Sequence, residues 1–182
     1  LKERAVLSDF TFMESIHAKT YGTILISLNT FKDIEEIYTW MNNDRRMQFK
    51  AKKINEIYQN GTPMQVKVAS VFLEGILYYS NFFIPLWYRG QNKLANLAEL
   101  IKLVIRDESV HGTYLGYKFR QDFNELSITE QENYTNWMYS YLEELLDNEF
   151  AYTEEVYSEI GLVEDIKTFV KYNANKSLQN MG

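Results

Sequence analysis

One long apolar segment constrains the fold of this 182-residue chain more than any other feature. Residues Val68 to Tyr88 contain a single charged side chain, Glu74, and are long enough to span a bilayer as a helix. The segment also carries Ser70, Asn81 and Pro85, lacks flanking basic clusters and has no counterpart elsewhere in the chain. We therefore favour a helix at the buried centre of a bundle over a membrane span. There, Glu74 is a carboxylate in a dry core, which is costly unless it is paired or bound to a metal.

Glycine and proline divide the chain into long helical segments with apolar residues at spacings of three and four. The first predicted helix is Val6–Asn29, and the second is Asp33–Gly61 with the Asp33 carboxylate as its cap. A third begins at Thr62-Pro63, and Pro85 bends or ends it. The remaining helices are Leu94–Phe123, the stretch from the Ser127–Glu130 capping box to about Ile160, and Val163–Leu178. No stretch of similar length alternates with period two, and no internal repeat is evident. The sequence predicts an all-α bundle, organised as a single domain over residues 1–182.

Composition excludes several classes of function. The chain has 19 basic and 25 acidic side chains, a net charge of −6, and no long Lys or Arg run. This balance argues against nucleic acid or an anionic membrane as the main partner. The absence of cysteine excludes disulfides, thiol nucleophiles and thiolate metal sites. The charged start leads directly into helical periodicity and does not resemble a signal peptide, so a cytoplasmic location is expected.

Both histidines of the chain follow a glutamate by three residues, as Glu14-x-x-His17 and Glu108-x-x-His111. Three residues is nearly one helical turn, so each pair projects from one face and can grip a common ion. Either pair alone is more simply a surface Glu–His contact, but their recurrence together with Glu74 favours a shared metal site. Carboxylate-bridged dinuclear sites in four-helix bundles use E-x-x-H on two helices and one acidic ligand on each of the others. Five of six ligands are thus present for dinuclear iron or dinuclear manganese, metals that suit oxygen and nitrogen ligands.

Tyr21 lies four residues after His17, one turn further along the same helical stripe. A tyrosine on an apolar helix is ordinarily a packing residue with a bonded hydroxyl. Beside a metal pair that activates O₂, the same phenol can instead be oxidised to a radical. Spacing alone leaves both interpretations open.

Several segments together resemble the small (β) subunit of class I ribonucleotide reductases, most closely the bacterial class Ib type, without its N-terminal part. The segments that carry the resemblance are Met13–Tyr21, Val71–Gly75, Ile105–Tyr114 and the closing Lys171–Lys176. The resemblance covers essentially the whole chain. It implies a ferritin-like four-helix-bundle core with additional helices.

The resemblance also implies a role for individual residues. The metal ligands would be Glu14, His17, Glu74, Glu108 and His111. Tyr21 would form the radical, and Asp107 would accept a hydrogen bond from the His17 imidazole and take part in electron transfer. Phe82 and Val104 would help to line an apolar pocket around the radical.

The implied activity is that of ribonucleoside-diphosphate reductase. Dinuclear iron, or dinuclear manganese with help from a flavodoxin-like activator protein, would react with oxygen species and leave a radical on Tyr21. The oxidising equivalent would then pass to the large (alpha) subunit, where ribonucleotides are reduced to deoxyribonucleotides. That reduction needs thiols, which this chain does not contain. A homodimer is expected.

Departures from the family pattern leave alternatives open. The family's sixth ligand, an Asp, lies well upstream of Glu14. Asp9 cannot replace it. The five residues from Asp9 to Glu14 turn a helix by about 500°, so Asp9 points away from the face that carries Glu14 and His17. The family's upstream helices and its C-terminal tail are both missing. Three explanations stay open: trimming, a split gene whose other half supplies the first helices as a complementing N-terminal fragment, or a sequence that gives only the core. Tyr78 stands where class Ib has phenylalanine, either as a tolerated aromatic or as a rival of Tyr21 for oxidation. Two other interpretations compete: a ferritin-like ferroxidase or metal-binding protein without a radical, and an inactive half of the subunit that needs a complementing fragment.

Overall fold

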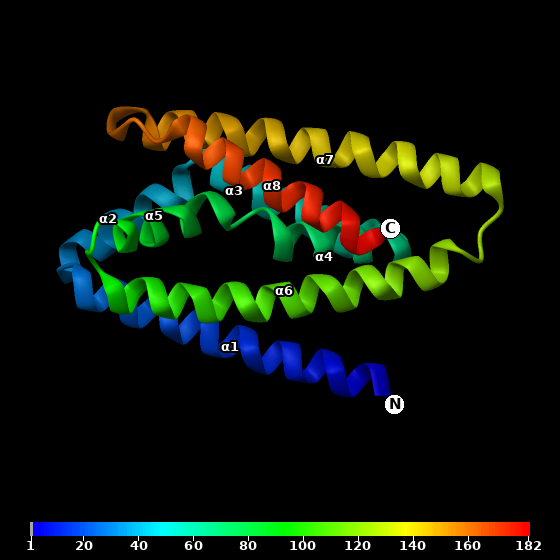
Figure 1. The fold of residues 1–182 in the computed structure, drawn as a ribbon, viewed down its shortest axis with the longest axis horizontal. Coiled ribbons are helices and arrows are strands. Elements are labelled where there is room, and N and C mark those ends of the chain that lie inside the picture. Colours follow the sequence, from blue (N-terminus) through cyan, green and yellow to red (C-terminus); the bar gives the residue numbers. More distant parts are fainter. Residues whose placement is uncertain (1) are drawn as a thin grey trace.

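The computed structural model describes residues 2–182, which form helices joined by short turns (Figure 1). In chain order the elements are α1 (Lys2–Leu28), α2 (Phe31–Asn43), α3 (Arg45–Asn60), α4 (Pro63–Gly75), α5 (Tyr79–Gly90), α6 (Ala95–Phe123), α7 (Ile128–Tyr157), a 3₁₀ turn (Ser158–Ile160) and α8 (Val163–Met181). Within residues 2–182 there is no strand. The predicted all-α fold is confirmed.

Helices α4 and α5 form the centre of the bundle (Figure 1). Both pack against α6 and α8, while α3 bridges α4 and α7, and α1 lies along α6. The main core fills the space between these helices, and Val68, Phe72, Leu145 and Ile166 keep no exposed surface there. The bundle therefore surrounds the apolar segment that dominates the sequence.

Burial accounts for the hydropathy of that segment. Among residues 2–182, one stretch, Pro63–Gly90, is long and apolar enough to cross a membrane by composition. Half of its most apolar window is buried inside the bundle. Residues 76–78 also interrupt the helix near its middle. These are the properties of a core helix that neighbouring helices enclose.

Capping boxes fix several helix starts. Ser127 pairs with Glu130 at the start of α7, and Thr62 pairs with Gln65 directly before α4. In α2 the capping residue is Thr30, whose N–H donates to the Asp33 carboxylate at 2.9 Å. Asp33 thus completes a capping box from the first turn of α2 instead of preceding the helix, which corrects the predicted start.

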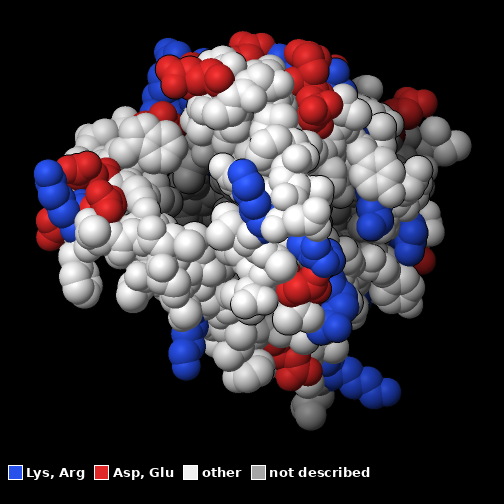
Figure 2. Space-filling view, turned by 60° about the vertical axis from the view of Figure 1, so that its left-hand side comes forward, with Lys and Arg blue, Asp and Glu red and all other residues white. Residues whose placement is uncertain are grey.

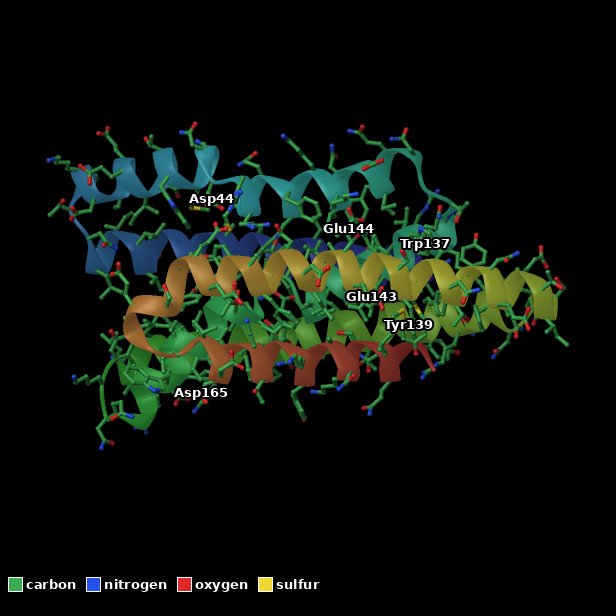
Figure 3. All side chains as sticks on the ribbon, turned by 90° about the horizontal axis from the view of Figure 1, so that it is seen from above. Asp44, Trp137, Tyr139, Glu143, Glu144 and Asp165 are labelled. Atoms are coloured by element: carbon green, nitrogen blue, oxygen red, sulfur yellow. The ribbon has the colours of Figure 1, made fainter. Side chains whose placement is uncertain are left out.

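The prediction of one helix from Asp33 to Gly61 is wrong. Asp44 ends α2 and caps α3, because its backbone is extended and its carboxylate accepts the N–H groups of Arg46 and Met47 at 3.0 and 2.8 Å (Figure 3). Apolar spacing did not reveal this break. Aspartate occurs both inside helices and at helix caps, so the apolar periodicity on either side of Asp44 does not locate the break.

Pro85 does not end its helix, so of the two predicted effects of this proline, a bend or an end, the end is wrong. Helix α5 passes through Pro85, and the interruption lies earlier, where Ile76 has φ −134° and ψ −51°. A proline removes one N–H donor and bends a helix, but neighbouring contacts can hold the helix together. The observed break follows Glu74 directly and therefore bears on the candidate site.

Charges of both signs are scattered over the end of the molecule that carries α2 and α5 (Figure 2). Between them this face is hollowed, and the rim of the hollow is formed mainly by uncharged side chains (Figure 2). The face shown therefore presents no broad patch of one sign.

Candidate metal centre

Residues from α1, α4 and α6 converge on one point in the bundle. Ligand atoms of Glu14, Glu74, Glu108 and His111 all lie within 4.8 Å of one another. Glu74 comes from the end of α4, which packs along α6, and α1 lies against α6 from the other side. Helix packing thus joins Glu14, the Glu108–His111 pair and the lone core carboxylate in a single cluster.

His17 faces the same cluster from α1. Its Nδ1 lies 3.3 Å from Glu14 Oε1 and 3.1 Å from Glu108 Oε1. This nitrogen is buried and has no hydrogen-bond partner of acceptable geometry. Buried polar atoms are rarely left unpaired, and a cation between the nitrogen and the two carboxylates would resolve the deficit. The residues present therefore fit a metal ion.

Glu108 lies between the two histidines. While its Oε1 faces His17, its Oε2 lies 3.1 Å from Nδ1 of His111. The two imidazole rings are 6.3 Å apart, and His111 Nδ1 also lies near the carboxylates of Glu14 and Glu74, at 3.3 and 3.6 Å. Glu108 would thus help to hold a metal ion together with either imidazole.

The carboxylates of the cluster and His111 shift one another's pKa values. Burial raises the pKa of Glu108 to about 8, and the carboxylates of Glu74 and Glu14 add to this against the hydrogen bond with His111. Burial lowers the pKa of His111, but hydrogen bonds to three carboxylates outweigh it and raise the pKa to about 11. The hydrogen bond with His111 lowers the pKa of Glu14. A metal ion would displace these protons when it binds.

Asp107 orients one of the imidazoles. Its Oδ2 lies 3.2 Å from Nε2 of His17, the contact that the family resemblance implies. A carboxylate at Nε2 fixes the ring so that Nδ1 points into the cluster.

Two neighbours of His111 escaped sequence reasoning. Its Nε2 lies 3.3 Å from Met13 Sδ, and its ring packs 4.1 Å from the ring of Phe10. Phe10 and Met13 precede His17 on one face of α1, at spacings of three and four. The apolar stripe of α1 would have revealed them.

Tyr21 lies beyond His17 on α1 and packs against a second, smaller core. The buried members of this core are 3–4% exposed: Tyr79, Phe82, Ile101 and Val104. Burial raises the pKa of Tyr21 above its usual value, and the nearby carboxylates Glu108 and Glu14 reinforce the effect. The phenol therefore keeps its proton in an apolar pocket beside the cluster.

Comparison with known proteins identifies the family of this site. Residues 1–182 match the family model of the ribonucleotide reductase small chain. The chain belongs to this family. It is 43% identical over 180 residues to ribonucleoside-diphosphate reductase 2 subunit beta of Escherichia coli (strain K12), which covers 99% of this chain and 56% of that protein. A subunit beta of Bacillus phage SPbeta is 40% identical over 188 residues, covering 100% of this chain and 57% of that protein.

Comparison with a solved structure identifies the fold. Dimanganese(II)-NrdF of Streptococcus sanguinis superposes with a TM-score of 0.96 at 57% identity, covering 98% of this chain and 63% of that one. The ferritin-like bundle with additional helices is thereby confirmed. The small chain described here spans little more than half the length of the curated relatives it matches.

Two further residues of the small chain lie where the sequence left questions. Asp9 is exposed and does not take part in the ligand cluster. Tyr78 is the last residue of the break at residues 76–78. It keeps 47% of its surface exposed and lines a cavity of about 390 Å³ together with Tyr58 of α3. The Glu14 side chain is half exposed, so the cluster is open on the side of α1.

Proposed function

We propose that this chain is the radical-generating part of a ribonucleoside-diphosphate reductase small subunit. The observation that carries the proposal is the cluster of Glu14, Glu74, Glu108 and His111 next to the unpartnered Nδ1 of His17, beside the partly buried phenol of Tyr21. Family membership supports it, and so does the dimanganese(II) named for the NrdF of Streptococcus sanguinis.

In this proposal the ligands are Glu14, His17, Glu74, Glu108 and His111, and they hold dinuclear iron or dinuclear manganese. When bound, such a metal pair supplies the oxidising power that removes one electron from a nearby phenol.

Other side chains prepare that phenol and its surroundings. Tyr21 is the group that is oxidised, and the walls formed by Phe82 and Val104 keep water and reductants away from it. Asp107 holds the ring of His17 in the orientation that the cluster needs. In the role implied by the family, the same carboxylate relays electrons between the metal centre and the rest of the pathway.

The lack of cysteine in this chain indicates that a second subunit carries out the reduction. Because it has no cysteine, it supplies no thiols, and the oxidising equivalent of Tyr21 passes to a large (alpha) subunit where ribonucleotides become deoxyribonucleotides. The small subunit acts as a homodimer in the cytoplasm, and a flavodoxin-like activator protein assists the manganese form. A sixth, carboxylate ligand comes from a segment outside these 182 residues, in the same protein or in a complementing fragment. The half-exposed Glu14 marks the side on which this ligand enters.

Electron paramagnetic resonance tests the proposal. The chain is loaded with Fe(II) and O₂, and separately with Mn(II) and the oxidised activator, with any complementing segment present. We expect a tyrosyl signal that disappears in Tyr21→Phe while the metal content stays unchanged. Tyr78→Phe is the matched control and keeps the signal. Bound metal without any radical would favour a ferroxidase, and loss of the signal in Tyr78→Phe alone would move the radical to Tyr78.

A further inference from the structure

The break between α4 and α5 releases a backbone carbonyl in the middle of the bundle. In a continuous helix the N–H of Asn81 would donate to the carbonyl of Leu77, but here it donates to that of Tyr78 at 3.1 Å. The ammonium group of Lys50, on α3, donates to the Leu77 carbonyl instead, at 3.2 Å. A charged side chain from another helix thus completes the backbone at the break.

Lys50 is one half of a buried ion pair. Its Nζ lies 2.6 Å from Oε2 of Glu149 on α7, and the two residues are 7% and 0% exposed. The other carboxylate oxygen of Glu149 accepts a hydrogen bond from the Ser80 hydroxyl, two residues beyond the break. Lys50 also lies over the ring of Tyr152, 4.3 Å from its centre.

A third contact secures the same turn. The hydroxyl groups of Tyr152 and Tyr157, both on α7, donate to Oδ1 of Asn81 at 2.9 and 2.7 Å. Residues 77, 80 and 81 are therefore each held by a polar side chain from α3 or α7. These contacts fall inside the interruption, at residue 77, or on the first turn after it, at residues 80 and 81.

Stability alone does not explain a buried ion pair. Apolar residues of similar volume commonly stabilise a core as well or better, because two charges must be taken out of water. Burial raises the pKa of Glu149, and Lys50 and Ser80 oppose that rise. What the pair provides beyond stability is a fixed set of donors and acceptors at one place, the break in the central helix.

That place lies between the metal cluster and the pocket of Tyr21. Glu74 is three residues before Leu77, and Phe82 is two residues after Ser80. Helix α8 also approaches this backbone: Gly75 lies so close to Ser177 that a Cβ at residue 75 would clash with the serine hydroxyl. The backbone that aims the Glu74 carboxylate is thus confined from two sides.

We propose that Lys50 and Glu149 are positioning residues that hold the break at residues 76–78, and thereby direct Glu74 into the metal cluster. This inference rests on the proposed metal-binding function. The same contacts fix the start of α5, so they also place Phe82 against Tyr21.

The test replaces the pair without leaving a lone buried charge. Lys50→Met with Glu149→Leu keeps the volume apolar but removes the donor to the Leu77 carbonyl and the acceptor for Ser80. The control is Lys53→Met with Glu144→Leu. That pair also joins α3 to α7 at 2.6 Å, with side chains 30% and 45% exposed. Glu144 lies on α7 (Figure 3), and within residues 2–182 no hydrogen bond or ion pair joins this pair to residues 76–81.

Mn(II) alone is the probe, with free Mn(II) measured by electron paramagnetic resonance and the fold checked by circular dichroism. We expect the double variant at Lys50 and Glu149 to bind Mn(II) about 10–100-fold more weakly than the wild type, the usual cost of losing a group that orients a ligand. The control variant should bind within about threefold of the wild type. Wild-type affinity in a folded double variant would overturn the proposal.

Hydrogen exchange in the metal-free chain gives a second readout. The amides of residues 76–82 should exchange faster in the double variant and at wild-type rates in the control. Unchanged exchange would overturn the proposal, even if metal affinity fell. If the double variant does not fold, Ser80→Ala removes one contact of the same set and must show both effects more weakly. If the wild type binds no Mn(II) even with the complementing segment present, the proposed function fails, and exchange still decides whether the pair holds the break.

Discussion

The closest approach of α6 to α8 gives a sharp prediction about stability. A Cβ added at Gly116 would lie 2.4 Å from the carbonyl oxygen of Asn180 and 2.7 Å from its carbonyl carbon, both backbone atoms that cannot rotate away. At Gly112, one turn earlier on the same face of α6, the nearest atom is the side-chain nitrogen of Asn180 at 3.6 Å, an ordinary contact. Gly116→Ala must therefore push the helices apart, and Gly112→Ala need not.

The magnitude follows from two opposing effects. Replacing glycine by alanine inside a helix stabilises it by about 0.8–1 kcal/mol, and both variants share this gain. Overpacking at Gly116 costs about 1–3 kcal/mol in addition, so the difference between the two variants isolates the clash.

Thermal unfolding of the metal-free variants, followed by circular dichroism, measures that difference. Each kcal/mol shifts the midpoint by about 2–4 °C in a chain of this size, so Gly116→Ala should melt roughly 2–12 °C below Gly112→Ala. Gly112→Ala should melt at or slightly above the wild type. Equal midpoints for the two variants would refute the reasoning, because they would show that α8 yields at no cost.

Three further predictions concern the cluster. Asp107→Ala frees the ring of His17 and should weaken Mn(II) binding about 10–100-fold, whereas unchanged affinity in a titration would contradict an orienting role. The folded-state pKa values of Glu108, about 8, and His111, about 11, lie above the ordinary 4.5 and 6.5, so the folded metal-free chain binds more protons than the unfolded one. Both groups therefore stabilise the folded chain fully at low pH, and this contribution declines as pH rises through the folded-state pKa values. The urea midpoint should be lower at pH 9 than at pH 6, and a midpoint that does not fall would contradict the raised pKa values. Mn(II) in excess should raise the thermal midpoint and a chelator should reverse the rise, while no response to Mn(II) would speak against a site in the folded chain.

Local chemistry made much of the architecture predictable. Capping boxes act over three residues, so Ser127 and Thr62 mark the starts of α7 and α4 without knowledge of the fold. The same holds for E-x-x-H, because a helical turn alone places both side chains on one face. A lone charge in an apolar segment then identifies Glu74 as the residue that needs a partner.

Contacts between distant segments were not predictable in this way. Neither residue of the Lys50–Glu149 pair stands out in a charged, amphipathic helix, and their meeting depends on how α3 and α7 pack. The break at residues 76–78 has the same origin, since its sequence is apolar and carries no glycine or proline. The break at Asp44 is different, because aspartate is a common capping residue. The apolar periodicity that continues through Asp44 concealed this break.

The burial pattern of α1 ties its attachment to the site it carries. Of all the residues in this helix, His17 alone is buried, and the rest of α1 is exposed or only partly covered. The other contacts of α1, from Phe10 and Met13 to His111 and from Tyr21 to the smaller core, are made by side chains that stay partly exposed. Under the proposed function, an ion bound at His17 would therefore strengthen the attachment of the first helix one turn before Tyr21, where the phenol needs shelter from solvent.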